Sequence, residues 1–372
     1  MKPLKKRINP LNITVIVLGF LFFTGWGVSM FHAEKSNHPT EDFINRLMTN
    51  DNHTLATYLQ EGSTEDVDLV SGREALSETL GIMMQYALEK NDPLLFKKQY
   101  YLLIRYFMND KGFIYWKLDK NGISNVSTNA TVDDLRIIDS LIQAYEMWGT
   151  KTYLRTSRLI SGYIEAHAIK DNRIVDYYDN ELDAKSDTVT LSFIDTKALL
   201  SMSKYNFLDQ NINQQMIRIL AKAPSKNGFY AKSFNIDEYM YLFDEEVNMI
   251  DQVLVALNRT RLGMEEHTYI HFLEKEFAKH GKLFGKYNRK LAEPSVVYES
   301  PALYALVILF LLENGESEFA VKLYDRLIQF KVDNPWSKHY GGYSIHDQNT
   351  HIFDNLLPMI AERKLRNQGL ID

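Results

Sequence analysis

The stretch SETLGIMMQYALEKNDPLLFKKQYYLLIRYF runs from Ser77 to Phe107 and indicates two antiparallel helices. Apolar residues recur at helical spacing on both sides of a short polar link, residues 90–93, and so short a link places two helices side by side. The first helix is apolar around most of its circumference, yet it carries Glu78. A carboxylate among apolar side chains costs free energy unless it is paired, neutralised or used. The pattern leaves two roles open for Glu78: a cap of the helix N-terminus, or a proton donor.

The same pattern continues to the C-terminus and predicts an all-α fold. Short links alternate with long ones, and the long links are rich in aromatic and acidic residues. A repeat of roughly 50 to 60 residues fits an open solenoid or a closed ring. The varying pair length, with the long loops on one side of each pair, favours a closed (α/α) barrel. Twelve helices are expected, over residues 40–50, 74–90, 93–109, 132–148, 150–168, 189–205, 210–222, 246–262, 265–280, 298–314, 316–331 and 350–364.

The first 33 residues differ from the rest of the chain. A basic segment precedes an uncharged run whose centre, residues 13–31, reads ITVIVLGFLFFTGWGVSMF. This run is just long enough to cross a hydrocarbon core of about 30 Å. By the positive-inside rule, residues 1–12 form a cytoplasmic N-terminus and residues 13–33 a single transmembrane helix, with everything after it exported. A cleaved signal peptide is the alternative, but no A-x-A pattern follows the run. We expect a linker over 34–45 and one barrel domain over 46–372.

Composition excludes several classes of protein. The chain has 372 residues and no cysteine, so a disulfide framework, a thiolate metal site and a cysteine nucleophile are all absent. The whole chain carries −6, and its first four charged residues are all basic, so the exported part carries −10. Such an acidic surface argues against nucleic acid and anionic lipid as the ligand and favours a neutral or cationic one. A cysteine-free exported protein also suits an envelope like that of Gram-positive bacteria.

Carboxylates are the best candidates for chemistry, and we expect no metal or other cofactor. Asp133 and Asp134 open the helix over 132–148, where at most one of them can serve the cap. Asp251 lies in another apolar helix, where it acts either as a buried structural acid bonded to Asn248 or as a functional group. A short strand and turn are expected in GFIYWKLDKNG, residues 112–122. The His267, His271 and Glu274 group has zinc-like spacing but fits an exposed helix face, and the Asp119 turn lacks the later ligands of a calcium loop.

Two stretches resemble glycoside hydrolase family 8. LSETLGIMMQYALEKNDPLLFKKQYYLLIRYFMNDKGFIYWKLDKNG, residues 76–122, is similar to that family's Ser-Glu-x-x-Gly helix start, aromatic-rich second helix and aromatic-Trp-x-x-Asp strand. ATVDDLRIIDSLIQAYEMW, residues 130–148, is similar to its A-[ST]-D-G-D-x-x-I-A pattern. Val132 and Asp133 stand where Asp-Gly is usual, and Ile138 replaces Ala. The similarity is specific over 76–148 and weaker over roughly 70–360.

The resemblance implies an (α/α)6 barrel and an inverting, endo-acting hydrolase of β-1,4-linked polysaccharide. It assigns the acid to Glu78 and a sugar-binding carboxylate to Asp134. The family's base opens a helix of the form Y-D-A-x-R-V, and IDQVLVAL, residues 250–257, matches it at Asp251, although Leu254 replaces the Arg. Asp244 is the reserve base. Inversion requires an acid and a base about 6.5 to 9.5 Å apart, which two hairpins facing one groove can supply.

We expect Trp116 to stack on a sugar ring, with a core Trp under the loop as the alternative role. Other expected substrate-binding residues are Tyr115, Asp133, Tyr177, Tyr178, Asn248 and Tyr298. The sequence as a whole predicts a single-pass, membrane-anchored, monomeric enzyme that cleaves an exopolysaccharide outside the cell, in polymer turnover, release or biofilm formation. Two alternatives stay open: a barrel that has lost efficient chemistry and binds the polymer during export or assembly, and a polysaccharide lyase or epimerase with a Tyr or His base.

Overall fold

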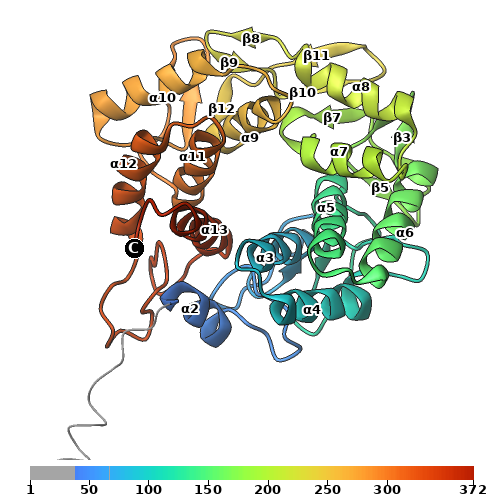
Figure 1. Ribbon diagram of the computed structural model, residues 1–372, viewed down its shortest axis with the longest axis horizontal. Helices are drawn as coiled ribbons and strands as arrows, with labels where there is room; N and C mark the ends of the chain where they lie inside the picture. The colour runs from blue at the N-terminus through green and yellow to red at the C-terminus, as the bar shows by residue number, and fades with distance from the viewer. Residues whose placement is uncertain (1–37, 67) are drawn as a thin grey trace, which may run out of the picture.

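The computed structural model describes residues 38–372 apart from residue 67, and it is a ring of helices in two layers (Figure 1). The inner and outer helices alternate along the chain, so each hairpin contributes one helix to each layer. The inner layer consists of α3 (Ser77–Glu89), α5 (Thr131–Trp148), α7 (Thr196–Lys204), α9 (Met249–Thr260), α11 (Pro301–Glu313) and α13 (Phe353–Asn367). The outer layer consists of α2 (Pro39–Leu47), α4 (Pro93–Leu102), α6 (Lys151–His167), α8 (Gln210–Ala221), α10 (His267–His280) and α12 (Ser317–Leu327).

The inner layer closes on itself. Each inner helix packs against the next along the chain, and α13 packs back against α3 as well as against α11. At this seam, Lys364 Nζ of α13 lies 2.8 Å from Glu89 Oε1 of α3. The ring therefore has no free edge, which confirms the expected closed barrel of helical hairpins.

Local sequence explains the tight link between α3 and α4. Asn91 takes a left-handed conformation with φ 53°, and the Asp92 side chain caps α4 by accepting a hydrogen bond from Leu95 N at 2.9 Å. Pro93 follows at the first helical position, where its missing N–H costs nothing. α4 then runs into a π-helical turn, η1 (Leu103–Phe107).

Helix α11 is apolar on every side because neighbours surround it. Its residues from Pro301 to Ile308 are all buried, between α9 and α13 within the ring and α12 outside it. At 13 residues it is about 20 Å long, shorter than a hydrocarbon core of about 30 Å. None of the helices in the described part of the chain combines the length and the apolar character that crossing a bilayer requires.

Long and short connections lie at opposite ends of the barrel. Because every outer helix runs back along its inner partner, all inner helices point the same way. The short turns leave their C-terminal ends, while the long connections lead into their N-terminal ends and form a rim. The rim holds six small antiparallel sheets: β1 (Ala75–Leu76) with β2 (Lys117–Leu118); β3 (Ile169–Lys170) with β4 (Arg173–Ile174); β5 (Tyr178–Asp179) with β6 (Ala184–Lys185); β8 (Ser225–Lys226) with β9 (Phe229–Tyr230); β10 (Ser233–Asn235) between β7 (Thr188–Thr190) and β11 (Met240–Leu242); and β13 (Lys286–Asn288) between β12 (Glu246–Asn248) and β14 (Glu293–Pro294).

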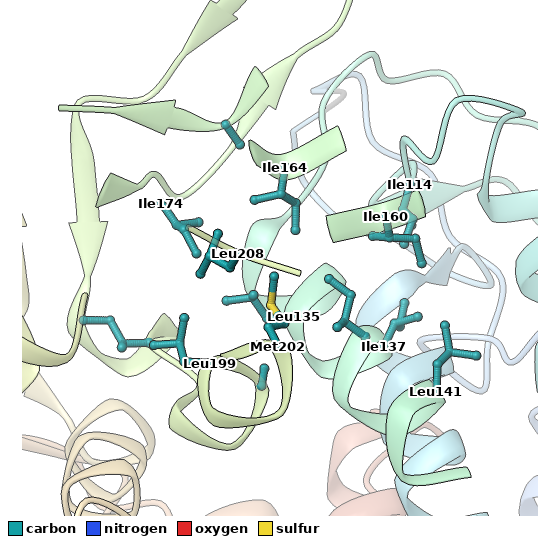
Figure 2. Packing of buried hydrophobic residues seen from close by; sticks show 14 of the residues in the cluster. Ile114, Leu135, Ile137, Leu141, Ile160, Ile164, Ile174, Leu199, Met202 and Leu208 are labelled. Carbon is teal, nitrogen blue, oxygen red and sulfur yellow. The ribbon is translucent and has the colours of Figure 1, made fainter. Parts of the chain in front are cut away.

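The hydrophobic core fills the space between the two layers. Figure 2 shows part of it, where Leu135, Ile137 and Leu141 of α5 lie near Ile160 and Ile164 of α6. These side chains are at most 1% exposed. The outward face of α5 is thus used for packing against α6.

All twelve expected helices are present, but some boundaries differ. The helix expected over 189–205 starts only at Thr196, because Thr188–Thr190 pairs with Ser233–Asn235 as a strand and Asp195 caps the helix. The helix expected over 246–262 starts at Met249 for a similar reason, after the strand β12. The strand and turn expected in residues 112–122 are confirmed as β2 and the Asp119–Gly122 turn.

Among the expected boundaries of the N-terminal segments and of the barrel domain, the start of the barrel lies within the described residues. The expected start of the barrel at residue 46 is too late, because α2 begins at Pro39 and its Phe43 and Ile44 are fully buried. The expected cytoplasmic segment over 1–12 and transmembrane helix over 13–33 lie outside the described residues.

Candidate active site

Acidic side chains gather where the inner helices begin. Glu78, Asp133, Asp134 and Asp251 all lie in the first turn of an inner helix. The helix dipole places partial positive charge at these ends, which stabilises nearby carboxylates. Because all six inner helices begin at the same rim, their first turns bring the acids of three helices, far apart in sequence, to one end of the ring (Figure 1).

Glu78 has no structural role in capping. The N-cap residue of α3 is Leu76, and among the described residues no side chain caps the helix or donates a hydrogen bond to the Glu78 carboxyl. Burial raises the pKa of Glu78 to about 8, with a further upward contribution from the Asp133 carboxylate and an opposing one from Arg136. The side chain is still partly exposed. Glu78 is therefore a carboxylic acid that keeps its proton near neutral pH and can present it to a ligand.

Asp133 joins helices α3 and α5 beside Glu78. Its Oδ2 accepts a hydrogen bond from Ser77 Oγ at 2.8 Å, and its Oδ1 lies 2.7 Å from Arg136 Nη1. The Arg136 side chain crosses α3 at Gly81, where an added Cβ would lie 3.2 Å from Arg136 Cδ. Gly81 follows Glu78 by three residues and so shares its helix face. This packing places the guanidinium next to the acid.

Asp134 is buried and only half satisfied. Its Oδ2 accepts a hydrogen bond from Asn129 Nδ2 at 2.6 Å, while its Oδ1 has no partner among the described residues. Burial raises the pKa of Asp134 well above its ordinary value. Asn129 is held in turn by Tyr178, whose backbone N donates to Asn129 Oδ1 at 2.7 Å. A free, buried carboxyl oxygen is a site for a ligand hydroxyl, because native structures rarely leave such atoms unpaired.

The aromatic residues predicted on this side divide into two groups. Trp116 is half-buried, and its carbonyl oxygen accepts a hydrogen bond from Ser77 N at 3.0 Å, which places it next to the acid. Tyr115 is half-buried and lines a cavity of about 550 Å³ with Thr128, Asp179 and Glu181. Tyr178, in contrast, is 4% exposed and donates its hydroxyl to Asp183, so its ring belongs to the core and its contribution is the backbone contact to Asn129.

Asp251 lies in the first turn of α9, the inner helix opposite α3 (Figure 1). Its Oδ1 accepts a hydrogen bond from Ser192 Oγ at 2.8 Å, and its Oδ2 lies 2.5 Å from Lys232 Nζ. Ser192 comes from a short 3-10 helix, η2 (Leu191–Phe193), and Lys232 from the link between β9 and β10. The expected bond from Asn248 to Asp251 is not present. Asn248 caps α9 instead, accepting a hydrogen bond from Ile250 N at 2.9 Å.

The remaining candidates are exposed residues of the rim. Asp244 is exposed on the turn between β11 and β12, where its carbonyl oxygen, rather than its carboxylate, binds Arg289 Nε at 2.8 Å. Tyr298 is 51% exposed and packs on Gly285, and Tyr177 is 46% exposed. Within the described part of the chain, none of these three side chains bonds to Glu78, Asp133 or Asp134. His267 and His271 are exposed on α10, and residues 38–372 without residue 67 contain no group of three or more His, Asp or Glu side chains placed to hold a metal ion.

Sequence reasoning missed several side chains that hold the acids, among them Asn129 beside Asp134. Arg136 follows Asp133 by three residues, a spacing that on a helix suggests an ion pair and could have revealed it. Ser192 and Lys232 reach Asp251 from segments 59 and 19 residues away. No local pattern indicates contacts of that kind.

In the described residues, a closed ring of inner helices, each paired with an outer helix, defines an (α/α) barrel, with the carboxyls of Glu78 and Asp134 at one rim. The family model for glycosyl hydrolases family 8 matches residues 37–176. The "Putative lipoprotein YdaJ" of Bacillus subtilis (strain 168) is 35% identical over 373 residues, covering 96% of this chain and 99% of that protein. The chain belongs to glycoside hydrolase family 8.

Solved structures of related chains share the fold over most of this chain. A protein described as a novel alpha-amylase from Clostridium perfringens is 28% identical with a TM-score of 0.79, covering 88% of this chain and 96% of that one. PssZ from Listeria monocytogenes is 25% identical with a TM-score of 0.70, covering 88% and 97%. Endoglucanase Cel10 from Klebsiella pneumoniae, at 13% identity, a TM-score of 0.58 and coverage of 88% and 99%, shows the fold alone.

Proposed function

We propose that the protein is a membrane-anchored, extracytoplasmic hydrolase that cleaves a β-1,4-linked exopolysaccharide within the chain, with inversion at the anomeric carbon. The observation that carries this proposal is Glu78, a carboxyl with a pKa of about 8, no capping role and no hydrogen-bond partner among the described residues, next to Trp116. An acid in that state can protonate the oxygen of a leaving sugar at neutral pH.

In this mechanism Glu78 donates its proton to the glycosidic oxygen while Asp251 takes a proton from the attacking water. Inversion needs the acid and the base on opposite faces of the sugar. The opposite positions of α3 and α9 in the ring support this assignment. Lys232 and Ser192 would orient the Asp251 carboxylate, and Asp134 Oδ1 would accept a sugar hydroxyl. Asp244 remains the reserve base.

Ring stacking would hold the polymer in place. Trp116 and Tyr115 would form the platform beside Glu78, with Asp133 ordering the same side through Ser77 and Arg136. Asn248 and Tyr298 would contact the polymer on the side of the rim that carries Asp251. Tyr177 would also contact the polymer. Apolar sugar faces and aromatic rings bury surface against each other while the hydroxyls stay available for hydrogen bonds.

An anchored enzyme would act on polymer at the cell surface, in turnover or release. The relative YdaJ is described as a lipoprotein, but this chain has no cysteine that could carry a lipid. The apolar run over residues 13–31 would be the anchor instead, with the barrel outside the cell as a monomer.

The test is a product profile of the full chain on β-1,4-glucan, chitosan-like and N-acetylhexosamine polymers. Starch belongs in the panel because one structural relative is described as an alpha-amylase. We expect reducing ends from a β-1,4-linked polymer, with the α-anomer formed first in proton NMR. Glu78→Gln should lower kcat by about 10² to 10⁴. Unchanged release by this variant, or a product with the β-anomer first, would overturn the mechanism.

The fold of Glu78→Gln is checked by its melting temperature. Folding raises the pKa of Glu78 to about 8. At low pH the carboxyl is protonated in both the folded and the unfolded state and does not affect stability. As pH rises towards about 8, the unfolded carboxyl ionises while the buried one stays protonated, so Glu78 increasingly opposes folding. The variant should therefore melt with the wild type at pH 5 and a few degrees above it at pH 9. A variant that melts lower at both pH values would make the activity loss uninformative, and Asp134→Asn then provides the second test of the site.

A polysaccharide-binding barrel is the second candidate. The observation in its favour is the 2.5 Å contact between Asp251 Oδ2 and Lys232 Nζ, which occupies one oxygen of the proposed base. Retained affinity for a polymer with no release of ends would establish this role. Products that absorb in the ultraviolet would instead indicate a lyase.

A further inference from the structure

The outer surface of α4 and η1 carries exposed apolar and basic side chains side by side. Leu94 is 75% exposed, Tyr101 61% and Ile104 42%. Lys97, Lys98 and Arg105 are exposed between and beside them. The spacing of three and four residues places all six on one side of the helix. We call these six residues the α4 face.

The α4 face is a basic island on an acidic domain. Residues 93–109 contain no Asp or Glu, while the chain after residue 33 carries −10. No salt bridge to Lys97, Lys98 or Arg105 is present within the described residues. The charge of this face is therefore available to an anionic partner.

A hollow continues the α4 face towards α2. It has a volume of about 450 Å³ and lies between the two outer helices, with buried Leu55, Met83 and Leu102 among its lining residues. Leu94, Lys97, Lys98 and Tyr101 belong to the same lining. An exposed apolar surface of this kind, edged by positive charge, is unusual on a monomer and marks an interaction site.

The position of α2 limits what can cover this surface. The expected transmembrane helix ends at residue 33 and α2 begins at Pro39, so the two helices are separated by five residues. Even fully extended, they span only about 18 Å. If residues 13–33 are embedded in a bilayer, α2 and the hollow beside it must stay close to that bilayer.

We propose that the α4 face lies against the anionic surface of the membrane, with Leu94, Tyr101 and Ile104 inserted at the interface and the basic side chains on lipid phosphates. Apolar side chains flanked by Lys and Arg are the pattern of surface-bound amphipathic helices. The attraction to an anionic leaflet falls off within a Debye length, and the tether keeps the basic side chains within that range. The exposed apolar residues of the rim, such as Leu182, belong to the polysaccharide side and are not part of this contact.

This inference rests on the proposed anchor and adds an orientation to it. With the outer wall of the barrel on the lipid, the rim faces sideways, and a polymer lying along the cell surface would reach the acids without leaving that surface.

The cysteine-free chain allows a direct test. The full chain, carrying Leu94→Cys with an environment-sensitive fluorophore, is reconstituted into nanodiscs of equal parts phosphatidylcholine and phosphatidylglycerol. Doxyl-labelled lipid should quench this probe severalfold more than a probe at Leu182→Cys, a position of similar exposure on the rim. Equal quenching at the two positions overturns the proposal. Quenching of the Leu94 probe by a second, doxyl-labelled copy of the chain, but not by lipid, would also overturn it and would indicate a dimer.

Charge reversal tests the electrostatic part. The double variant Lys97→Glu with Lys98→Glu should lower the lipid quenching at Leu94 severalfold. The matched control, Lys275→Glu with Lys279→Glu on the distant helix α10, changes the net charge equally and should leave it unchanged. Equal effects of the two pairs would overturn the specific contact. Flotation of the chain with vesicles separately reports the anchor, and release of reducing ends separately reports the activity.

Discussion

Arg136 controls how tightly Glu78 holds its proton. Its positive charge favours the ionised form of the acid and so opposes the effect of burial on the pKa. Removal of the charge should raise the pKa of Glu78 above about 8. The ion pair with Asp133, at 2.7 Å, holds the guanidinium in place and partly offsets its positive charge.

We therefore expect Arg136→Met to move the alkaline limb of the kcat/KM pH profile to higher pH. Arg136→Lys, which keeps the charge, should leave the limb close to the wild type. Because Met leaves Asp133 buried and unpaired, it should also lower the free energy of unfolding by about 3 kcal/mol. An unmoved alkaline limb in Arg136→Met would show that Glu78 titrates without influence from this residue.

The candidate site residues that stand out in the sequence are those that break a local pattern. Glu78, Asp133, Asp134 and Asp251 are acids at the start of otherwise apolar helices, and that contrast is visible without a structure. Tyr178 looked equally suitable as an aromatic residue in a long loop, but it is buried. A loop residue's exposure depends on what the other loops cover, and this is why aromatic platforms are harder to predict than helix-start acids.

At the scale of elements, the contact between α3 and α5 depends on Gly81. An Ala at this position would gain about 1 kcal/mol of helix propensity. Its Cβ, however, would lie 3.2 Å from Arg136 Cδ and 3.4 Å from Ile137 Cγ1. Arg136 cannot easily yield, because its other end is fixed by Asp133.

Gly81→Ala should therefore destabilise the protein by about 1 to 2 kcal/mol in urea unfolding, since overpacking outweighs propensity. Gly162→Ala is the matched control, because nothing lies within 4 Å of an added Cβ at that position in α6. It should be stabilising by about 0.5 to 1 kcal/mol. A stabilising effect of both substitutions would show that α5 can move away from α3.

The number and order of helices could be read from the sequence, but several helix starts could not. Residues 189–195 fit a helical pattern, and they fold otherwise because Thr188–Thr190 pairs with Ser233–Asn235, more than 40 residues away. Strand pairing between distant loops competes with local helix propensity, and only the folded rim decides the outcome.

At the scale of the whole molecule, closure through α13 couples all six hairpins. Leu356 of α13 is fully buried where the ring closes. In an open solenoid each repeat is held only by its neighbours, so a lesion at one end leaves the other end folded. A closed ring has no such independent end.

We expect Leu356→Ala to lower the free energy of unfolding by about 2 to 5 kcal/mol. The midpoint should shift equally by far-ultraviolet circular dichroism and by tryptophan fluorescence, although Trp116, in the connection that leads into α5, and Trp148, at the end of α5, are distant from α13 in sequence. Leu182→Ala, at a side chain 76% exposed, should change little. Separate midpoints for the two signals would mean that the hairpins unfold independently.

The alternation of short turns at one end and long loops at the other also affects how such a protein can diverge. Closure depends on the helices and the short turns, whereas much of the surroundings of the acids comes from the long loops that lead into the inner helices. A lineage can therefore lengthen, shorten or exchange a loop, and so acquire a different sugar, without disturbing the ring that supports it. In such proteins the fold is then conserved more than the sequence, and a relative's fold is a better guide to this chain than that relative's substrate.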